Sequence, residues 1–343
     1  MSTEQSWQKE FGQSFKSSKD LSNFLEMDVK ISDYPIFIPK QFAKKIKRDG
    51  VGSPLWNQFI PSPQENSEQG LIDPIGDQIH QKGGGIIHRY KSRILFSPTE
   101  ICPINCRYCF RKNELQQNLD TFKASLNDLS EYLENHSEIS EVILTGGDPL
   151  ILSDSKIESI LNTISNFKHI RFVRFHSRTP VILPQRLTES LHAVLSSFKD
   201  QFDTITIAIH INHKTEFSEQ LIENLKPFQD FNLISQSVLL KNVNDNTQSL
   251  IDLFLELNKH KIKPYYLHHP DQVRGAMHFY LPIKEGRILY GELREHLPGW
   301  LIPHYVVDSS DGTGKKLAYN SESLDYSGQM LDRFGQTHSF SIE

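Results

Sequence analysis

The chain has 343 residues, of which 37% are hydrophobic, and a formal net charge of -5. This mild negative charge favours neither a nucleic acid nor an anionic membrane as a partner. No run of about 18 apolar residues predicts a transmembrane helix, and the N-terminal stretch lacks the apolar core of a signal peptide. We therefore expect a cytoplasmic protein.

The N-terminal quarter of the chain is predicted to form a cap. Residues 20–27 and 38–47 carry apolar side chains at three- and four-residue spacing, which predicts two short helices. Residues 60–85 are rich in Pro, Gly and polar side chains, a composition typical of a linker or an access loop. We expect residues 1–85 to form this helical cap and its linker.

Strands and helices are predicted to alternate after residue 85. The short apolar runs that predict buried strands are 93–96, 141–146, 171–176, 204–210, 233–240, 263–269 and 302–308. Amphipathic stretches that predict helices lie between most of them, for example 126–135, 156–166, 219–228 and 248–259. This order predicts βαβ units around a parallel sheet, either open or closed into a barrel. Functional residues then gather at the carboxyl ends of the strands.

All three cysteines of the chain follow the first of these strands, at Cys102, Cys106 and Cys109. Disulfides are rare in a reducing compartment, so clustered thiols indicate metal binding or redox chemistry. Three thiolates leave one position open in a four-ligand site. His88 could close a zinc site, whereas an iron-sulfur cluster would keep one iron free for another ligand.

The spacing CxxxCxxC in "CPINCRYCF", with Tyr108 before the last cysteine, resembles the signature of the radical S-adenosylmethionine (SAM) superfamily. The resemblance implies a [4Fe-4S] cluster on the three cysteines, with SAM bound to the open iron. It also implies an α/β fold, a partial (β/α)6-type TIM barrel, which we expect over residues 86–316, with a C-terminal tail at 317–343.

The segment "TGGDPL" ends the second strand, and a glycine pair at such a position is by itself most often a bare turn. In the radical SAM superfamily this is the place of the glycine-rich stretch that faces the cofactor. The resemblance therefore implies SAM contacts at Gly146, Gly147 and Asp148. Secondary SAM contacts are expected at Ser177, Arg178 and Gln236.

The last strand opens into "SSDGTGKK", which lacks the phosphate-loop pattern. The sequence "VVD", a glycine-rich turn and then a lysine resemble the lysine 2,3-aminomutase family, whose lysine forms a Schiff base with pyridoxal phosphate. The resemblance implies that Lys315 is this lysine, and Lys316 is the weaker candidate. The positions that match the family's pyridoxal phosphate contacts are Arg89, Tyr90 and Arg93.

The same resemblance indicates the substrate. Asp271 and Asp308 match the aspartates that bind the ε-ammonium of lysine in the family, so lysine is favoured over glutamate. Arg111 matches the arginine that binds the substrate carboxylate, and bidentate pairing of this kind fixes orientation as well as charge.

Within the family, the length of the chain, its N-terminal "WQKEF" and His268 resemble the bacterial members that serve elongation factor P. The expected product is (R)-β-lysine, with a ligase for the factor as partner and flavodoxin or ferredoxin as reductant. The alternatives are an aminomutase for free lysine metabolism or for another amino acid, and a non-enzymatic iron-sulfur module.

Overall fold

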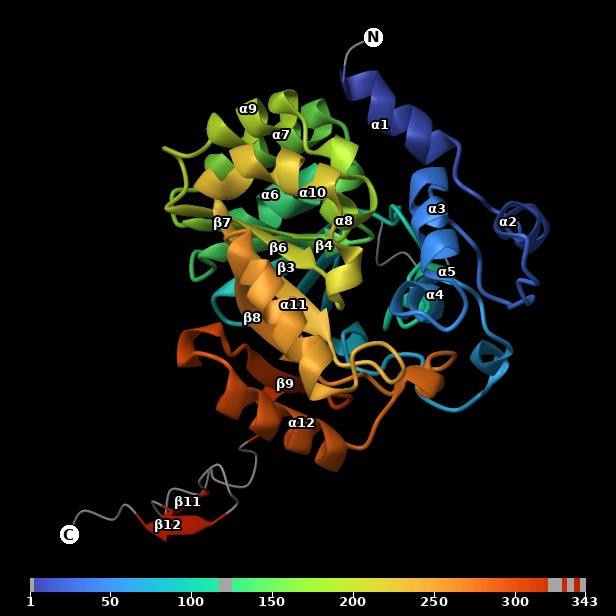
Figure 1. The fold of residues 1–343 in the computed structure, drawn as a ribbon. Helices are drawn as coiled ribbons and strands as arrows, with labels where there is room; N and C mark the ends of the chain where they lie inside the picture. The colour runs from blue at the N-terminus through green and yellow to red at the C-terminus, as the bar shows by residue number, and fades with distance from the viewer. Residues whose placement is uncertain (1–2, 117–124, 320–328, 332–335, 340–343) are drawn as a thin grey trace.

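The computed structural model describes residues 3–116, 125–319, 329–331 and 336–339. One ten-stranded sheet dominates this part of the chain, with its strands in the order β1 to β10 (Figure 1). Its seven central strands are parallel. They are β3 (Arg93–Thr99), β4 (Glu141–Gly146), β5 (Phe172–Ser177), β6 (Thr204–His210), β7 (Asn232–Val238), β8 (Lys263–His268) and β9 (His304–Ser309).

Helices connect these parallel strands. They are α5 (Lys112–Gln116), α6 (Leu126–Glu134), α7 (Asp154–Ser165), α8 (Thr179–Ile182), α9 (Glu189–Ser196), α10 (Glu219–Leu225), α11 (Thr247–Lys259) and α12 (Ile283–His296). Five of them begin after a residue whose side chain accepts a backbone N–H of the first turn, namely Ser125, Ser153, Thr188, Ser218 and Asn246. Such capping satisfies donors that have no partner inside the helix.

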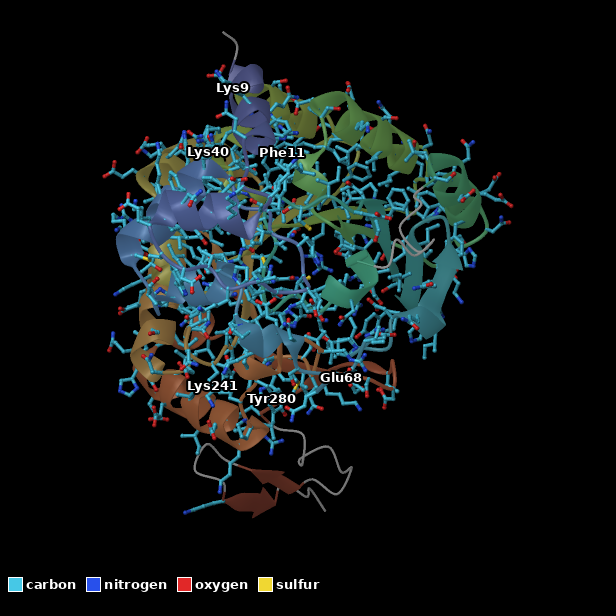
Figure 2. All side chains as sticks on the ribbon, turned by 90° about the vertical axis from the view of Figure 1, so that its right-hand side faces the viewer. Lys9, Phe11, Lys40, Glu68, Lys241 and Tyr280 are labelled. Atoms are coloured by element: carbon cyan, nitrogen blue, oxygen red, sulfur yellow. The ribbon has the colours of Figure 1, made fainter. Side chains whose placement is uncertain are left out.

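The remaining elements flank the parallel strands. Two hairpins extend the sheet, β1 (Gln81–Gly83) with β2 (Ile86–Tyr90) on one edge and β10 (Gly314–Leu317) beside β9 on the other. The N-terminal helices are α1 (Thr3–Gly12), α2 (Ser18–Leu25), α3 (Lys40–Asp49) and α4 (Pro54–Phe59). They lie along one side of the barrel, the side that faces the viewer in Figure 2, where Lys9, Phe11 and Lys40 are labelled. A separate hairpin joins β11 (Gln329–Leu331) and β12 (Thr337–Ser339).

Side chains of the parallel strands alternate between two environments. In β6 the residues that line the interior cavity are Thr206, Ala208 and His210. Their neighbours, which belong to the hydrophobic core, are Ile205, Ile207 and Ile209. Successive side chains of a strand point to opposite faces. The core therefore lies between sheet and helices, whereas polar and apolar side chains together line the barrel interior.

The structure confirms the predicted partial barrel, in which six strand-helix units are followed by a seventh parallel strand. Lys315 is placed differently from the prediction, because it lies on strand β10 rather than in a loop. Residues 60–85 also include ordered elements, the 3₁₀ helices η1 (Pro63–Asn66) and η2 (Gln78–His80) and strand β1. The boundaries at 85/86 and 316/317 stay predictions, and most of the tail 317–343 lies outside the described residues.

Within the described ranges, no helix has both the length and the apolar composition that crossing a lipid bilayer requires.

Replacing Ile207 by Ala should lower the free energy of unfolding by about 2–5 kcal/mol, because the side chain is fully buried between sheet and helices. Thr206→Ser, one position away on the cavity side, should change it by less than about 0.5 kcal/mol. Denaturant unfolding followed by circular dichroism measures both. Equal losses in the two variants would contradict the assignment of core and cavity faces.

Candidate active site

One cavity of about 780 Å³ runs through the interior of the barrel. All the cofactor and substrate residues that the family resemblance implies line this cavity, whereas Lys316, the weaker lysine candidate, and His88, the candidate zinc ligand, are not among its lining residues. The cysteine loop and the glycine-rich turn lie at the carboxyl ends of β3 and β4, and Lys315 lies on β10 at the far edge of the sheet. The fold thus brings together residues that lie more than two hundred positions apart in the sequence.

The three cysteine thiols face this cavity in a buried setting. Burial raises the pKa of all three thiols, that of Cys109 to about 11, and the proximity of Cys109 raises that of Cys102 further. A cationic metal centre beside these thiols would favour their thiolate forms. This donor set fits an iron-sulfur cluster, in which each cysteine binds one iron.

The glycine-rich turn packs directly on the segment that leads into the cysteine loop. The backbone N–H of Gly147 donates to the carbonyl of Thr99 at 2.7 Å, and that of Asp148 donates to Ile101 at 2.8 Å. A Cβ atom on Gly147 would collide with the backbone carbonyl of Ile101, and Gly146 has a φ of +94°. Both glycines are therefore required for this close approach, whatever they contact in the cavity.

The Asp148 carboxylate joins the ends of β4 and β5. It accepts from the Ser177 hydroxyl at 2.7 Å, from the backbone N–H groups of Arg178 and Thr179 at 2.6 and 2.9 Å, and from Leu150 at 3.0 Å. Burial raises its pKa, although these donors oppose the shift. Its oxygens are thus engaged within the protein, and its predicted contact with SAM stays a prediction.

The other predicted SAM residues also have partners within the barrel. Arg178 donates to Glu216 at 2.6 Å and to the Tyr108 hydroxyl, between the second and third cysteines. Gln236, on β7, lies 3.2 Å from the ring nitrogen of His176. Arg178 is thus held beside the cysteine loop, and Gln236 is held in the middle of the cavity.

Lys315 is held at the edge of the barrel by Tyr90. The Tyr90 hydroxyl accepts the backbone N–H of Lys315 at 2.8 Å, which links β2 to β10. A Cβ atom on Gly314 would collide with this hydroxyl, and Gly314 has a φ of +95°, so only glycine fits here. The Lys315 ammonium donates to Asp308, its neighbour across the hairpin, at 2.8 Å.

The two predicted substrate carboxylates face the same space but differ in their partners. Asp308 pairs with Lys315 and more distantly with Arg89, at 3.5 Å. Within the described residues Asp271 forms no ion pair, and burial together with the nearby Asp308 raises its pKa to about 7. His268, 3.9 Å from Asp308, has its pKa lowered to about 3 by burial and by Lys315. A cation would therefore be stabilised by Asp271.

Sequence reasoning missed Asp77, which bridges two of the predicted arginines. Its carboxylate pairs with Arg89 and with Arg111, each at 2.7 Å, and all three side chains are buried. Asp77 comes from the segment that we predicted as a linker. The glycines and aspartates of "DPIGDQ" are ordinary turn residues, so only the three-dimensional structure reveals this role.

Sequence reasoning also missed Arg174, which lies on β5 and faces the cavity. It pairs with Glu141 at 2.9 Å, and within the described residues its buried Nε has no acceptor. Arg93 lies nearby on β3, with its guanidinium 3.8 Å from the centre of the Tyr90 ring. A buried donor without an acceptor beside a second cation fits a phosphate group, which pyridoxal phosphate would supply.

Comparison with known proteins identifies the family of this chain. The profile of the Radical SAM superfamily matches residues 96–254. The L-lysine 2,3-aminomutase of Buchnera aphidicola is 35% identical over 84% of this chain and 84% of its own length. Those of Haemophilus influenzae and Escherichia coli are each 34% identical, over 83% and 79% of this chain and 84% and 79% of their own lengths. The chain therefore belongs to the lysine 2,3-aminomutase family of radical SAM enzymes, isomerases whose cofactors are a [4Fe-4S] cluster, S-adenosylmethionine and pyridoxal phosphate.

Proposed function

We propose that the protein is an L-lysine 2,3-aminomutase, which converts L-lysine into (R)-β-lysine. The observation that carries this proposal is the pair of carboxylates, Asp271 and Asp308, at the cavity wall beside Lys315. Of the two, Asp271 has no cation as partner within the described residues and a pKa raised to about 7. A buried, destabilised carboxylate of this kind favours a substrate with a cationic side chain.

Arg111 supplies the second charge that a free amino acid requires. Its guanidinium lies on the cavity wall just after the third cysteine and is oriented by Asp77. The substrate's carboxylate would bind Arg111 and its side-chain ammonium would bind Asp271 and Asp308. Two charged contacts of opposite sign in one cavity select a substrate that carries both a carboxylate and a side-chain ammonium.

The cofactors, when bound, supply the radical chemistry that moves an amino group between neighbouring carbons. Cys102, Cys106 and Cys109 would hold the cluster, and Lys315 would provide the amine that attaches to the aldehyde of pyridoxal phosphate. Arg93 and Arg174 would hold its phosphate. The walls of the barrel would limit the contact of the reacting groups with water and keep them in a fixed order.

We further propose that the β-lysine serves the modification of elongation factor P, with a ligase as partner. Support comes from His268, at a position where the members that degrade free lysine tend to have tyrosine. Incubating the enzyme and its cofactors with lysine, the ligase and the factor should add β-lysine to the factor. A factor that stays unmodified while free β-lysine accumulates would contradict this part of the proposal.

The aminomutase proposal is tested by an anaerobic assay with lysine, SAM, pyridoxal phosphate and a reductant. We expect β-lysine by chromatography, and no product from glutamate, arginine or ornithine. Turnover of glutamate or arginine in place of lysine would contradict the proposed substrate.

Replacing Lys315 by Ala should abolish the visible absorbance of lysine-bound pyridoxal phosphate and reduce β-lysine formation by at least about 10³-fold. Lys316→Ala is the matched control, because that side chain is half exposed and lies 3.8 Å from Asp311. Absorbance that persists in Lys315→Ala, or is lost in Lys316→Ala instead, would assign the amine to another residue.

Lysine binding to the cofactor-loaded protein should depend on pH through Asp271. Below about pH 7 this carboxyl is protonated, so a cation binds only after a proton is lost. With a pKa near 7, the ionised fraction rises about tenfold between pH 6 and pH 8, and the dissociation constant should fall by the same factor. Calorimetric titration at each pH measures this dissociation constant.

In Asp271→Asn the binding should be weaker and this pH dependence should disappear. Asp311→Asn serves as the control, because this side chain is exposed, and it should show the same pH dependence of lysine binding as wild type. A wild-type affinity that does not change between pH 6 and pH 8 would contradict the role of Asp271.

A further inference from the structure

Three charged side chains are buried beside the cysteine loop but outside the cavity. Glu65, Arg107 and Lys112 have side-chain exposures of 0%, 2% and 6%, respectively. Arg107 lies between the second and third cysteines, and Lys112 begins the helix that follows the loop. Glu65 comes from η1 in the N-terminal segment, 42 residues before Arg107. No role assigned above includes these three residues.

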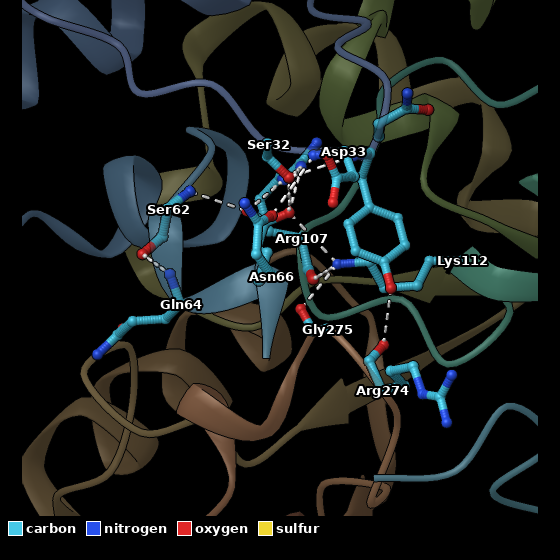
Figure 3. A network of polar contacts seen from close by, with 12 residues as sticks. Ser32, Asp33, Ser62, Gln64, Asn66, Arg107, Lys112, Arg274 and Gly275 are labelled. Carbon is cyan, nitrogen blue, oxygen red and sulfur yellow. Dashed lines mark hydrogen bonds and ion pairs between the residues drawn. The ribbon is translucent and has the colours of Figure 1, made fainter. Parts of the chain in front are cut away.

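Arg107 is fixed by the N-terminal segment through its whole guanidinium. Nε donates to Glu65 at 2.8 Å, and Nη2 pairs with the other oxygen of the same carboxylate. Nη1 donates to the carbonyl of Pro35 at 2.8 Å, and Nη2 also reaches the Ser32 hydroxyl at 3.2 Å. This bidentate pairing leaves the guanidinium a single orientation. Figure 3 shows Arg107 enclosed in this way.

Lys112 joins the same carboxylate to two backbone groups. Its ammonium lies 3.4 Å from Glu65 and donates to the carbonyl groups of Arg107 at 3.0 Å and Gly275 at 2.9 Å (Figure 3). It also lies 3.7 Å from the centre of the Tyr34 ring. The backbone between the second and third cysteines is thus held by a cation that depends on Glu65 for its charge balance.

Backbone hydrogen bonds attach the same loop to the N-terminal segment. The N–H of Arg107 donates to the carbonyl of Gln58 at 2.9 Å. That of Asn105, just before the second cysteine, donates to Phe37 at 3.1 Å, and its side-chain amide donates to Pro35 at 3.0 Å. The residues between the cysteines therefore contact the cap, whereas the cysteines themselves face the cavity.

Electrostatics make Glu65 the critical member of this network. Within the described residues it is the carboxylate with which both buried cations pair, and it also accepts from the Ser32 hydroxyl at 2.9 Å and the Ser62 N–H at 2.9 Å. Removing one partner of a buried ion pair leaves an uncompensated charge that must reach water. Here the loss of Glu65 would leave two like charges, and hydrating them would pull the cysteine loop away from the cap.

We propose that Glu65 is a positioning residue for the iron-sulfur cluster, because it holds Arg107 and Lys112 against the N-terminal segment and so keeps the thiols at the spacing that the cluster needs. The inference rests on the assignment of the three cysteines as cluster ligands. It makes the N-terminal cap part of the cluster housing. The cap would thereby determine how long the cluster is retained.

The test compares Glu65→Gln with wild type after anaerobic reconstitution with iron and sulfide. We expect iron loss to a chelator to be at least about tenfold faster in Glu65→Gln. The electron paramagnetic resonance spectrum of the reduced cluster should also change, because the segment between Cys106 and Cys109 has moved. Ser32→Ala, which removes one donor to Glu65, should show a smaller increase and keeps the test informative if Glu65→Gln does not fold.

The matched control is Asp154→Asn, which breaks another buried ion pair, with Arg186 at 2.7 Å. It should lower thermal stability to a similar extent but leave iron loss and the spectrum as in wild type. Equal rates of iron loss in wild type and Glu65→Gln, or an equal acceleration in Asp154→Asn, would overturn the proposal. Wild type that binds no iron and sulfide would overturn it together with the cysteine assignment, whereas a loaded but inactive wild type would contradict the aminomutase activity alone.

Discussion

The alternation of side chains along seven parallel strands is the constraint on which the rest of the structure depends. In β6 and β7, for example, one face of the strand belongs to the hydrophobic core and the other lines the interior of the barrel. Because the outer faces supply the core, the inner faces are free to carry charge. Arg93, Arg174 and Asp308 reach the cavity from strands β3, β5 and β9. Asp77, Arg111 and Asp271 reach it from loops.

Charge inside this cavity is organised by carboxylates that each serve more than one cation. Asp77 joins Arg89 to Arg111, and Asp308 joins Arg89 to Lys315. The cations are therefore fixed before any ligand binds, and little reorganisation is needed when a carboxylate or phosphate arrives. Asp271 is the exception, since its charge is suppressed until a cation reaches it.

Sequence reasoning predicted the fold, because the alternation of strands and helices depends on local patterns. The cysteine spacing lies within eight consecutive residues, and the strands each occupy a short apolar run. Family membership, the isomerase class and the cofactors, which the resemblance implied, are confirmed by the comparisons. The roles of the individual site residues stay predictions.

The residues that were missed act through partners distant in sequence. Asp77 pairs with an arginine 34 residues away, and Glu65 with one 42 residues away. No periodicity links such positions, and an aspartate or glutamate in a polar segment is ordinary. Arg174 was overlooked for another reason, because a strand interpreted as a buried apolar run hides the polar side chains on its inner face.

The contact between Tyr90 and Lys315 also determines how the barrel is closed. Within the described chain no backbone ladder joins β10 to β1 or β2. Side-chain contacts join the two edges of the sheet instead: Tyr90 with Lys315, Arg89 with Asp308, and His80 with Gly312. Two strands joined by a backbone ladder separate only when several hydrogen bonds break together, whereas side-chain contacts can break one at a time. Side-chain contacts, rather than a backbone ladder, thus close this part of the wall, and Lys315, which would hold the cofactor, stands at its edge.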